Sequence, residues 1–208
     1  MSHPLPHVLR AGLAALGLFT ATLAAAAPVT VFSDDFEDGS VADWSVSASA
    51  GVITPVVATR SDAVHGGLYA MQTYFDAPSG GVGSNFVRAS HSFTAATTGD
   101  YLLELWARSA PCGGCTMYFD VLVDGVSQLH DGSAQTTYAF RSLTLSNLTA
   151  GLHTLTLGMF TTDASSGRFQ ASFDDVRITT EASATVPEPT TLALVAGGLL
   201  LAGARRRR

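Results

Sequence analysis

Short runs of alternating apolar and polar residues, separated by turn residues, do most to restrict the fold of this 208-residue chain. Between residues 27 and 186 no window keeps the three-to-four-residue apolar spacing of an amphipathic helix. The alternation is clearest in residues 101–108, where one face carries Tyr101, Leu103, Leu105 and Ala107. Successive side chains of a strand point to opposite faces, so this pattern predicts strands with one buried side.

The same alternation predicts strands at residues 68–75, 86–93, 101–108, 117–123, 126–130, 138–145, 153–160 and 167–179. Asp124 and Gly125 supply a hairpin turn between two of them. In residues 117–123 the pattern places Met117, Phe119, Val121 and Val123 inside and Tyr118, Asp120 and Leu122 outside. This many short strands without crossover helices predict an all-β fold, an antiparallel β-sandwich.

The two ends of the chain differ in composition from this central part. Arg10 precedes an apolar stretch, residues 11–27, that ends in small residues, which is the layout of a secretory signal peptide cleaved after Ala25 or Ala26. The alternative is a retained N-terminal anchor. We therefore expect a signal peptide at 1–26, the β-sandwich domain at 27–180, a linker at 181–185 and a separate C-terminal segment at 186–208.

The C-terminal segment combines the triplet Pro187, Glu188 and Pro189 with an apolar run at 192–204 and a cluster made of Arg205, Arg206, Arg207 and Arg208. Proline fixes φ and lacks an N–H donor, so the triplet favours an extended conformation. The apolar run is shorter than the roughly 20 residues of a typical spanning helix. Snorkelling arginine stems nevertheless allow it to cross a thin bilayer as a transmembrane helix. The alternative interpretation, from composition alone, is a plain C-terminal tail anchor.

The order of these features resembles the PEP-CTERM sorting signal of Gram-negative bacteria. The resemblance covers only the tail, and it implies an exosortase-type transpeptidase as partner, with cleavage near Pro187. We expect a precursor held in the inner membrane by the C-terminal helix, with the arginines on the cytoplasmic side. The released or re-attached domain then belongs to the cell surface or the extracellular space.

The charge of the central domain excludes several kinds of partner. Five of the 11 basic residues and one of the 17 acidic residues lie in the terminal segments, which leaves six bases and 16 acids and a net charge of −10. Such a surface is repelled by nucleic acid and by anionic membranes. It is compatible with calcium, or with a neutral or cationic surface.

Cys112 and Cys115 are the only cysteines, and Gly113 and Gly114 separate them. An even number of cysteines in an exported chain favours a disulfide, and the two glycines permit a tight turn between the paired residues. The alternatives are a redox-active pair and half of a zinc site. Redox pairs usually lie at a helix N-terminus, and no further zinc ligands have the required spacing.

Four segments, in order, resemble galactose-binding-like jelly rolls, and most of all the carbohydrate-binding modules of families 4, 9 and 22. They are the opening D-D-F-E-D-G followed by Trp44, the segments 63–71 and 101–108, and the closing F-D-D-V-R-I at 173–178. The resemblance implies a jelly-roll β-sandwich. A fold of this kind does not by itself settle function.

In those modules a structural calcium ion joins the first strand to the last. The resemblance places its ligands at Glu37 and Asp174, because alternation points Asp175 to the other side of the strand. Calcium takes six to eight oxygens, so backbone carbonyls, for instance from the turn at 65–67, would complete the shell. The alternative is an ordinary solvated acidic surface without an ion.

A second candidate site lies on the face opposite the core. Five residues are expected to project there from neighbouring strands: Trp106, Tyr118, Glu104, Asp120 and Arg108. Aromatic rings stack on the apolar faces of sugars and charged groups bind the hydroxyls, so the set predicts a glycan-binding patch. The alternative is a second small core beneath a loop.

Little in the sequence indicates catalysis. Glu104 and Asp120 have the chemistry of a glycosidase acid pair, but pairs of acids across strands are common. No serine has a nucleophile-elbow context, and the histidines share no metal-ligand spacing. We predict a non-catalytic exported protein of the cell surface or extracellular matrix, associated with exopolysaccharide in a biofilm and binding glycan. The alternatives are a purely structural envelope protein and, more remotely, a glycan-active enzyme.

Overall fold

The computed structural model describes residues 27–77, 85–110, 117–132, 136–161 and 167–181, and this part of the chain contains strands and connecting loops but no helix. They are β1 (Val29–Asp34), β2 (Ser45–Ala48), β3 (Ile53–Arg60), β4 (Ala70–Ala77), β5 (Asn85–Ala95), β6 (Gly99–Ala110), β7 (Tyr118–Val123), β8 (Val126–Asp131), β9 (Ala139–Leu148), β10 (Gly151–Thr161) and β11 (Gly167–Thr180). In these ranges no helix is long and apolar enough to cross a membrane. The all-β prediction is confirmed.

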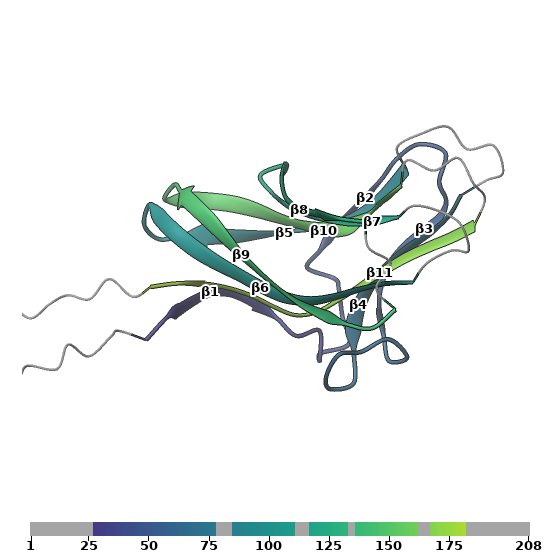
Figure 1. Cartoon of the computed structure of the whole chain (residues 1–208), viewed down its shortest axis with the longest axis horizontal. Coiled ribbons are helices and arrows are strands. Elements are labelled where there is room, and N and C mark those ends of the chain that lie inside the picture. Colours follow the sequence, from purple (N-terminus) through teal and green to yellow (C-terminus); the bar gives the residue numbers. More distant parts are fainter. Residues whose placement is uncertain (1–26, 78–84, 111–116, 133–135, 162–166, 182–208) are drawn as a thin grey trace, which may run out of the picture.

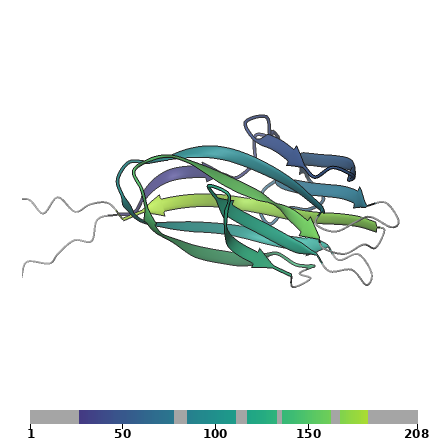
Figure 2. The same ribbon diagram turned by 90° about the horizontal axis from the view of Figure 1, so that it is seen from above.

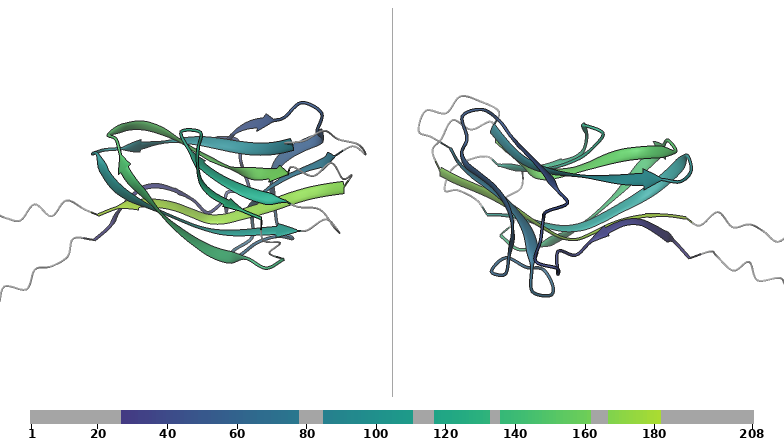
Figure 3. Two further views of the ribbon diagram at one scale, coloured as in Figure 1. Left: turned by 45° about the horizontal axis from the view of Figure 1, so that its top comes forward. Right: turned by 180° about the vertical axis from the view of Figure 1, so that it is seen from behind.

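The strands form two antiparallel sheets that face one another (Figure 1). Sheet A has the order β3-β4-β11-β6-β9, with β1 also paired to β11, and sheet B has the order β2-β5-β10-β7-β8. The long strand β11 pairs with β4 through its first half and with β1 through its second half. Figures 2 and 3 show it running along the length of the sandwich. The first and last strands of the domain therefore lie side by side, with Val29 opposite Thr180.

The core lies between the sheets and consists of the residues that alternation places inside. From β6 it takes Tyr101, Leu103, Leu105 and Ala107, and from β7 Phe119, Val121 and Val123. The ring of Phe119 meets that of Phe173 of β11 edge-on at 6.3 Å, which joins the two sheets. Each large apolar side chain buried in this way stabilises the fold by about 1.5–3 kcal/mol. The predicted inward faces of both strands are confirmed.

Strands β1, β2 and β3 are present although alternation does not predict them. Strands β2 and β3 lie at the edges of their sheets. Strand β3 contains Pro55, which cannot donate a ladder hydrogen bond, and its register with β4 shifts between Ile53 and Val56. Its side chains are exposed or half-buried along the whole strand. An edge strand without a fully buried face has no reason to alternate, so its sequence carries little strand signal.

Candidate functional site

A carboxylate that follows the first strand holds the loop between β3 and β4, residues 61–69. Glu37 accepts the N–H of Leu68 at 2.9 Å on each carboxylate oxygen, and the N–H of Tyr69 at 2.9 Å. Gly67 has a φ of +60°, and a Cβ at this position would lie 2.3 Å from the Glu37 carboxyl group. The loop therefore comes so close to Glu37 that it requires glycine at position 67.

A carboxylate from the last strand holds the preceding part of the same loop. Asp174 of β11 is 1% exposed, and its Oδ2 accepts the N–H groups of His65 at 2.8 Å and Gly66 at 3.2 Å. Its Oδ1 accepts the N–H of Asp175 at 2.9 Å. Burial raises the pKa of Asp174, although the N–H bonds from the loop act in the opposite direction.

Hydrogen bonds thus occupy both residues predicted to bind calcium. Every carboxylate oxygen of Glu37 and Asp174 accepts at least one backbone N–H. Calcium takes six to eight oxygen ligands, whereas the groups against these carboxylates are N–H donors. Hydrogen bonding through the loop already joins the first strand to the last. A calcium ion at Glu37 and Asp174 stays a prediction.

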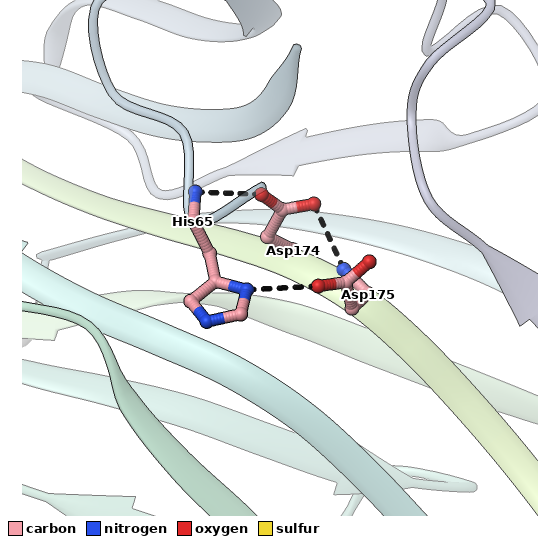
Figure 4. Close-up of side chains that lie close together, drawn as sticks. All are labelled: His65, Asp174 and Asp175. Atoms are coloured by element: carbon pink, nitrogen blue, oxygen red, sulfur yellow. Dashed lines mark hydrogen bonds and ion pairs between the residues drawn. The ribbon is translucent and has the colours of Figure 1, made fainter. Parts of the chain in front are cut away.

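The two neighbouring aspartates of β11 do not follow strict alternation, contrary to the expectation that Asp175 points away from Asp174. The register between β11 and β6 shifts between Asp174 and Arg177, and Asp175 has a φ of +49°. Such a bulge adds a residue to one strand and redirects the side chains beside it. Asp175 Oδ2 lies 2.9 Å from Nδ1 of His65, and Asp174 adjoins them both (Figure 4). The bulge therefore gathers one imidazole and two carboxylates.

Aromatic rings surround His65 on the outer face of sheet A. The imidazole stacks on Trp106 of β6, with ring centroids 3.7 Å apart and 13° between the planes. Trp106 also contacts its register partner on β9, Phe140, at 5.4 Å. Tyr138 meets His65 edge-on and donates its hydroxyl to the carbonyl of Ala63 at 2.5 Å. Burial raises the pKa of Tyr138, so this hydroxyl stays protonated and remains a donor.

The rings of Trp106 and Phe140 line an open cleft of about 570 Å³, which we call the sheet A cleft. Its lining also contains the carboxylates of Asp34, Asp35, Asp38, Glu104 and Asp175 and the guanidinium of Arg177. Glu104 and Arg177 form an ion pair at 2.5 Å between β6 and β11. The cleft therefore combines two aromatic rings with an excess of negative charge.

The aspartates beside β1 are partly used by the local turn. Asp34 accepts the N–H of Phe36 at 2.9 Å on one oxygen and the indole N–H of Trp44 at 2.7 Å on the other. Asp35 and Asp38 each accept the N–H two residues further on, at 3.2 and 2.9 Å. These are the side-chain turns that aspartate commonly makes. Asp35 and Asp38 are exposed, while Asp34 is half-buried and bonded through both oxygens.

The predicted glycan patch does not exist as one surface. Trp106, Glu104 and Arg108 lie on β6 in sheet A, whereas Tyr118 and Asp120 lie on β7 in sheet B. Strands β6 and β7 are consecutive in the chain, but they pair with different neighbours and face each other across the core. Their outward residues therefore point to opposite sides of the sandwich. Of the set, only Trp106 and Glu104 reach the cleft; the Arg108 guanidinium lies 5.4 Å from the ring of Tyr138.

On sheet B the two remaining residues have structural partners. The Asp120 side chain is only 4% exposed; its oxygens pair with Arg88 at 2.6 Å and with Nδ1 of His130 at 2.5 Å. Tyr118 stacks on His130 with centroids 4.2 Å apart and also contacts Phe160. Because Asp120 is buried and bonded through both oxygens, its position serves packing within sheet B.

Sequence reasoning missed His65 and Phe140. Phe140 reaches the cleft because β9 pairs with β6 in a register that sets it opposite Trp106, and alternation within one strand does not reveal that register. His65 lies in an irregular loop, 109 residues from Asp174. The H-G-G sequence at 65–67 was the available signal, because glycines allow a loop to approach a carboxylate closely.

Several predicted features lie outside the described residues. They are the signal peptide at 1–26, the cysteines Cys112 and Cys115, and the tail with Pro187, Glu188, Pro189 and the arginines 205–208. The disulfide and the cleavage positions stay predictions.

The tail can still be compared by sequence. Residues 185–208 match the PEP-CTERM protein-sorting motif, which confirms the resemblance found from the triplet, the apolar run and the arginines. The motif identifies the chain as an exported protein addressed to an exosortase. A comparison with curated proteins finds no match.

Solved structures share the fold of this chain at low sequence identity. The K3 cleaved adhesin domain of Lys-gingipain from Porphyromonas gingivalis has a TM-score of 0.51 at 17% identity, over 74% of this chain and 99% of its own. The CBM22-1-CBM22-2 tandem domain of Xyn10C from Paenibacillus barcinonensis has a TM-score of 0.50 at 18% identity, over 82% of this chain and 50% of its own. A carbohydrate-binding module of the β-sandwich superfamily, described as promiscuous in specificity, has a TM-score of 0.50 at 12% identity, over 69% and 60%. The chain thus spans half to three fifths of these last two structures and has the β-sandwich fold of carbohydrate-binding modules.

Proposed function

We propose that this chain is a non-catalytic exported protein that binds glycan through the sheet A cleft. The observation that carries the proposal is the pairing of Trp106 with Phe140, two rings 5.4 Å apart on neighbouring strands of one open face. Phe140 is 47% exposed, so a ligand has access to its ring. Clefts that combine aromatic side chains with a few polar groups are the usual form of a small-molecule site.

The chemistry of the cleft suits a sugar. The C–H groups of a pyranose ring pack on aromatic faces and bury apolar surface, at about 25 cal/mol per Å². Beside the rings, Glu104 offers carboxylate acceptors and Arg177 offers N–H donors. Hydrogen bonds to charged groups are stronger than those between neutral groups, so this pair can fix the orientation of sugar hydroxyls.

The setting of the domain supports the same function. The sorting motif directs the chain out of the cytoplasm, and polysaccharide is available outside the cell. Two of the similar folds are carbohydrate-binding modules. We propose that exosortase processing near Pro187 delivers the domain to the cell surface or extracellular matrix. There it associates with exopolysaccharide of a biofilm.

A purely structural envelope protein is the second candidate, and two contacts favour it. His65 already covers one face of the Trp106 indole, and the Glu104 carboxylate is already paired with Arg177. In this case the cleft residues would only support the fold of sheet A.

Binding measurements on the purified exported protein distinguish the two candidates. Glycans selected on an array are titrated calorimetrically against the wild type, Trp106→Ala and Phe140→Ala. We expect each substitution to weaken binding at least tenfold, because central aromatic contacts commonly carry most of the binding energy.

The matched control is Leu152→Ala, which removes a large side chain that is 73% exposed on β10 of sheet B. It should leave glycan affinity unchanged. Equal affinity of all four proteins would show that glycan binds outside the sheet A cleft. No binding to any glycan on the array would favour the structural envelope protein.

A further inference from the structure

One imidazole and two carboxylates meet at the edge of the sheet A cleft. Nδ1 of His65 lies 2.9 Å from Oδ2 of Asp175, and the candidate ligand atoms of His65, Asp174 and Asp175 all lie within 4.8 Å of one another (Figure 4). No other group of three histidine, cysteine or acidic side chains comes as close among the residues that the structure describes.

We propose that His65, Asp174 and Asp175 bind a divalent transition-metal ion of the zinc class. An imidazole nitrogen suits zinc, nickel, cobalt and copper, whereas calcium selects oxygen ligands. The site therefore differs from the predicted calcium site in its ion and in two of its ligands, and it does not use Glu37. Three protein ligands leave at least one position for water or another small ligand.

The distances allow the three side chains to close on one ion. Zinc bonds nitrogen and carboxylate oxygen at about 2.0–2.2 Å, so its ligand atoms lie roughly 3.5 Å apart in a tetrahedral site. The separation of His65 and Asp175 is already shorter than this, and a separation of up to 4.8 Å has to contract by roughly 1.3 Å. His65 and Asp175 are the residues able to move toward the buried Asp174, because their side chains are 29% and 47% exposed. The ion would take the place of the hydrogen bond between Nδ1 and Oδ2, so that the His65 ring would bind through Nδ1 and carry its N–H on Nε2.

The surrounding contacts orient the ligands, as metal sites require. Trp106 stacks on the His65 ring at 3.7 Å and fixes its plane. Backbone N–H groups of His65 and Gly66 fix the buried Asp174 carboxylate through Oδ2. Asp175 also lines the sheet A cleft, whose excess of carboxylates attracts cations and offers a path of entry.

A hydrogen-bonded triad without any ion is the competing interpretation of the same geometry. In that case His65 and Asp175 form an ordinary hydrogen bond, and Asp174 only holds the loop. Only the metal site predicts saturable binding of a metal ion, and this binding can be measured independently of glycan binding.

The test uses the exported protein without a histidine tag. Zn²⁺ is titrated calorimetrically against the wild type, His65→Asn and Asp175→Asn. We expect one ion to bind per chain, with at least tenfold weaker binding in each variant. Cu²⁺ provides a second readout: bound at His65 it should quench the fluorescence of the stacked Trp106, and His65→Asn should lose that quenching.

The control His91→Asn removes a histidine of β5 in sheet B that packs against Phe32 and Trp44, and it should bind Zn²⁺ like the wild type. A Ca²⁺ titration with Glu37→Gln completes the set. Absence of saturable Zn²⁺ binding would overturn the proposal, as would binding that survives His65→Asn. Tighter binding of Ca²⁺ than of Zn²⁺, lost in Glu37→Gln, would overturn it in favour of the predicted calcium site.

Discussion

The outer faces of the two sheets carry the same kinds of side chain, but these side chains differ in burial and in their partners. On sheet B, Asp120 is bonded to Arg88 and His130, and Tyr118 stacks on that histidine. On sheet A, Asp175 pairs with His65, and the histidine stacks on Trp106. The Asp120 side chain is 4% exposed and that of Asp175 is 47% exposed.

This difference separates a structural cluster from a candidate site. A buried carboxylate whose oxygens pair with the side chains of an arginine and a histidine is committed to those partners, and its removal leaves the arginine charge unpaired. A half-exposed carboxylate beside an open cleft keeps that capacity, and its removal costs the fold little. Residue type is the same on both faces, so burial and pairing decide the role.

The largest test of this contrast compares Asp120→Asn with Asp175→Asn. We expect Asp120→Asn to lower the free energy of unfolding by about 3 kcal/mol, because it leaves the Arg88 charge without its partner in a largely buried position. Asp175→Asn should change the free energy of unfolding by less than about 1 kcal/mol, because the pair is exposed. Urea unfolding of both variants measures the difference. Equal effects would show that burial does not distinguish the two faces.

A smaller effect tests how tightly Asp120 and its partners Arg88 and His130 pack on sheet B. Arg88 reaches Asp120 across Gly158 of β10, which lies opposite both residues in the ladder. A Cβ at Gly158 would lie 2.4 Å from the carbonyl oxygen of Val87 and 2.8 Å from the Cα of Arg88. Because backbone atoms cannot move aside easily, Gly158→Ala should destabilise the protein by about 1–3 kcal/mol.

The control for that substitution is Gly99→Ala, where a Cβ meets no atom within 4 Å. It should unfold within about 0.5 kcal/mol of the wild type, as surface substitutions usually do. Thermal or urea unfolding measures both variants. If Gly158→Ala were as stable as Gly99→Ala, the outer face of sheet B would be loose enough to admit a ligand.

How far the sequence predicts this arrangement follows from what alternation encodes. Within β6 and β7 it places each side chain on the correct face, because burial of one face selects apolar residues at every second position. It does not encode which strands are neighbours, so the predicted glycan-binding patch combines Trp106 and Tyr118 although they lie on opposite sheets. It also fails at the β11 bulge, where one extra residue turns Asp175 toward His65.

The smallest expected effect concerns a histidine of sheet B with both ring nitrogens in hydrogen bonds. Nδ1 of His153 lies 2.6 Å from Asp124, and Nε2 lies 2.7 Å from the carbonyl oxygen of Thr149. Both acceptors favour the protonated ring, so the bonds to Asp124 and Thr149 raise the pKa of His153. Burial tends to raise the pKa of Asp124, but the bonds from His153 and the N–H of Thr154 outweigh it and lower that pKa.

The sign of the pH dependence follows from these two directions. A raised histidine pKa gives stability that is complete below its ordinary pKa of about 6.5 and is lost as pH rises through the raised value. The lowered pKa of Asp124 gives stability above about pH 4 that is lost on further acidification. We therefore expect the urea midpoint of the wild type to fall as the pH rises above about 6.5, and to fall less in His153→Asn. A slope unchanged by His153→Asn would mean that folding does not raise the pKa of this ring.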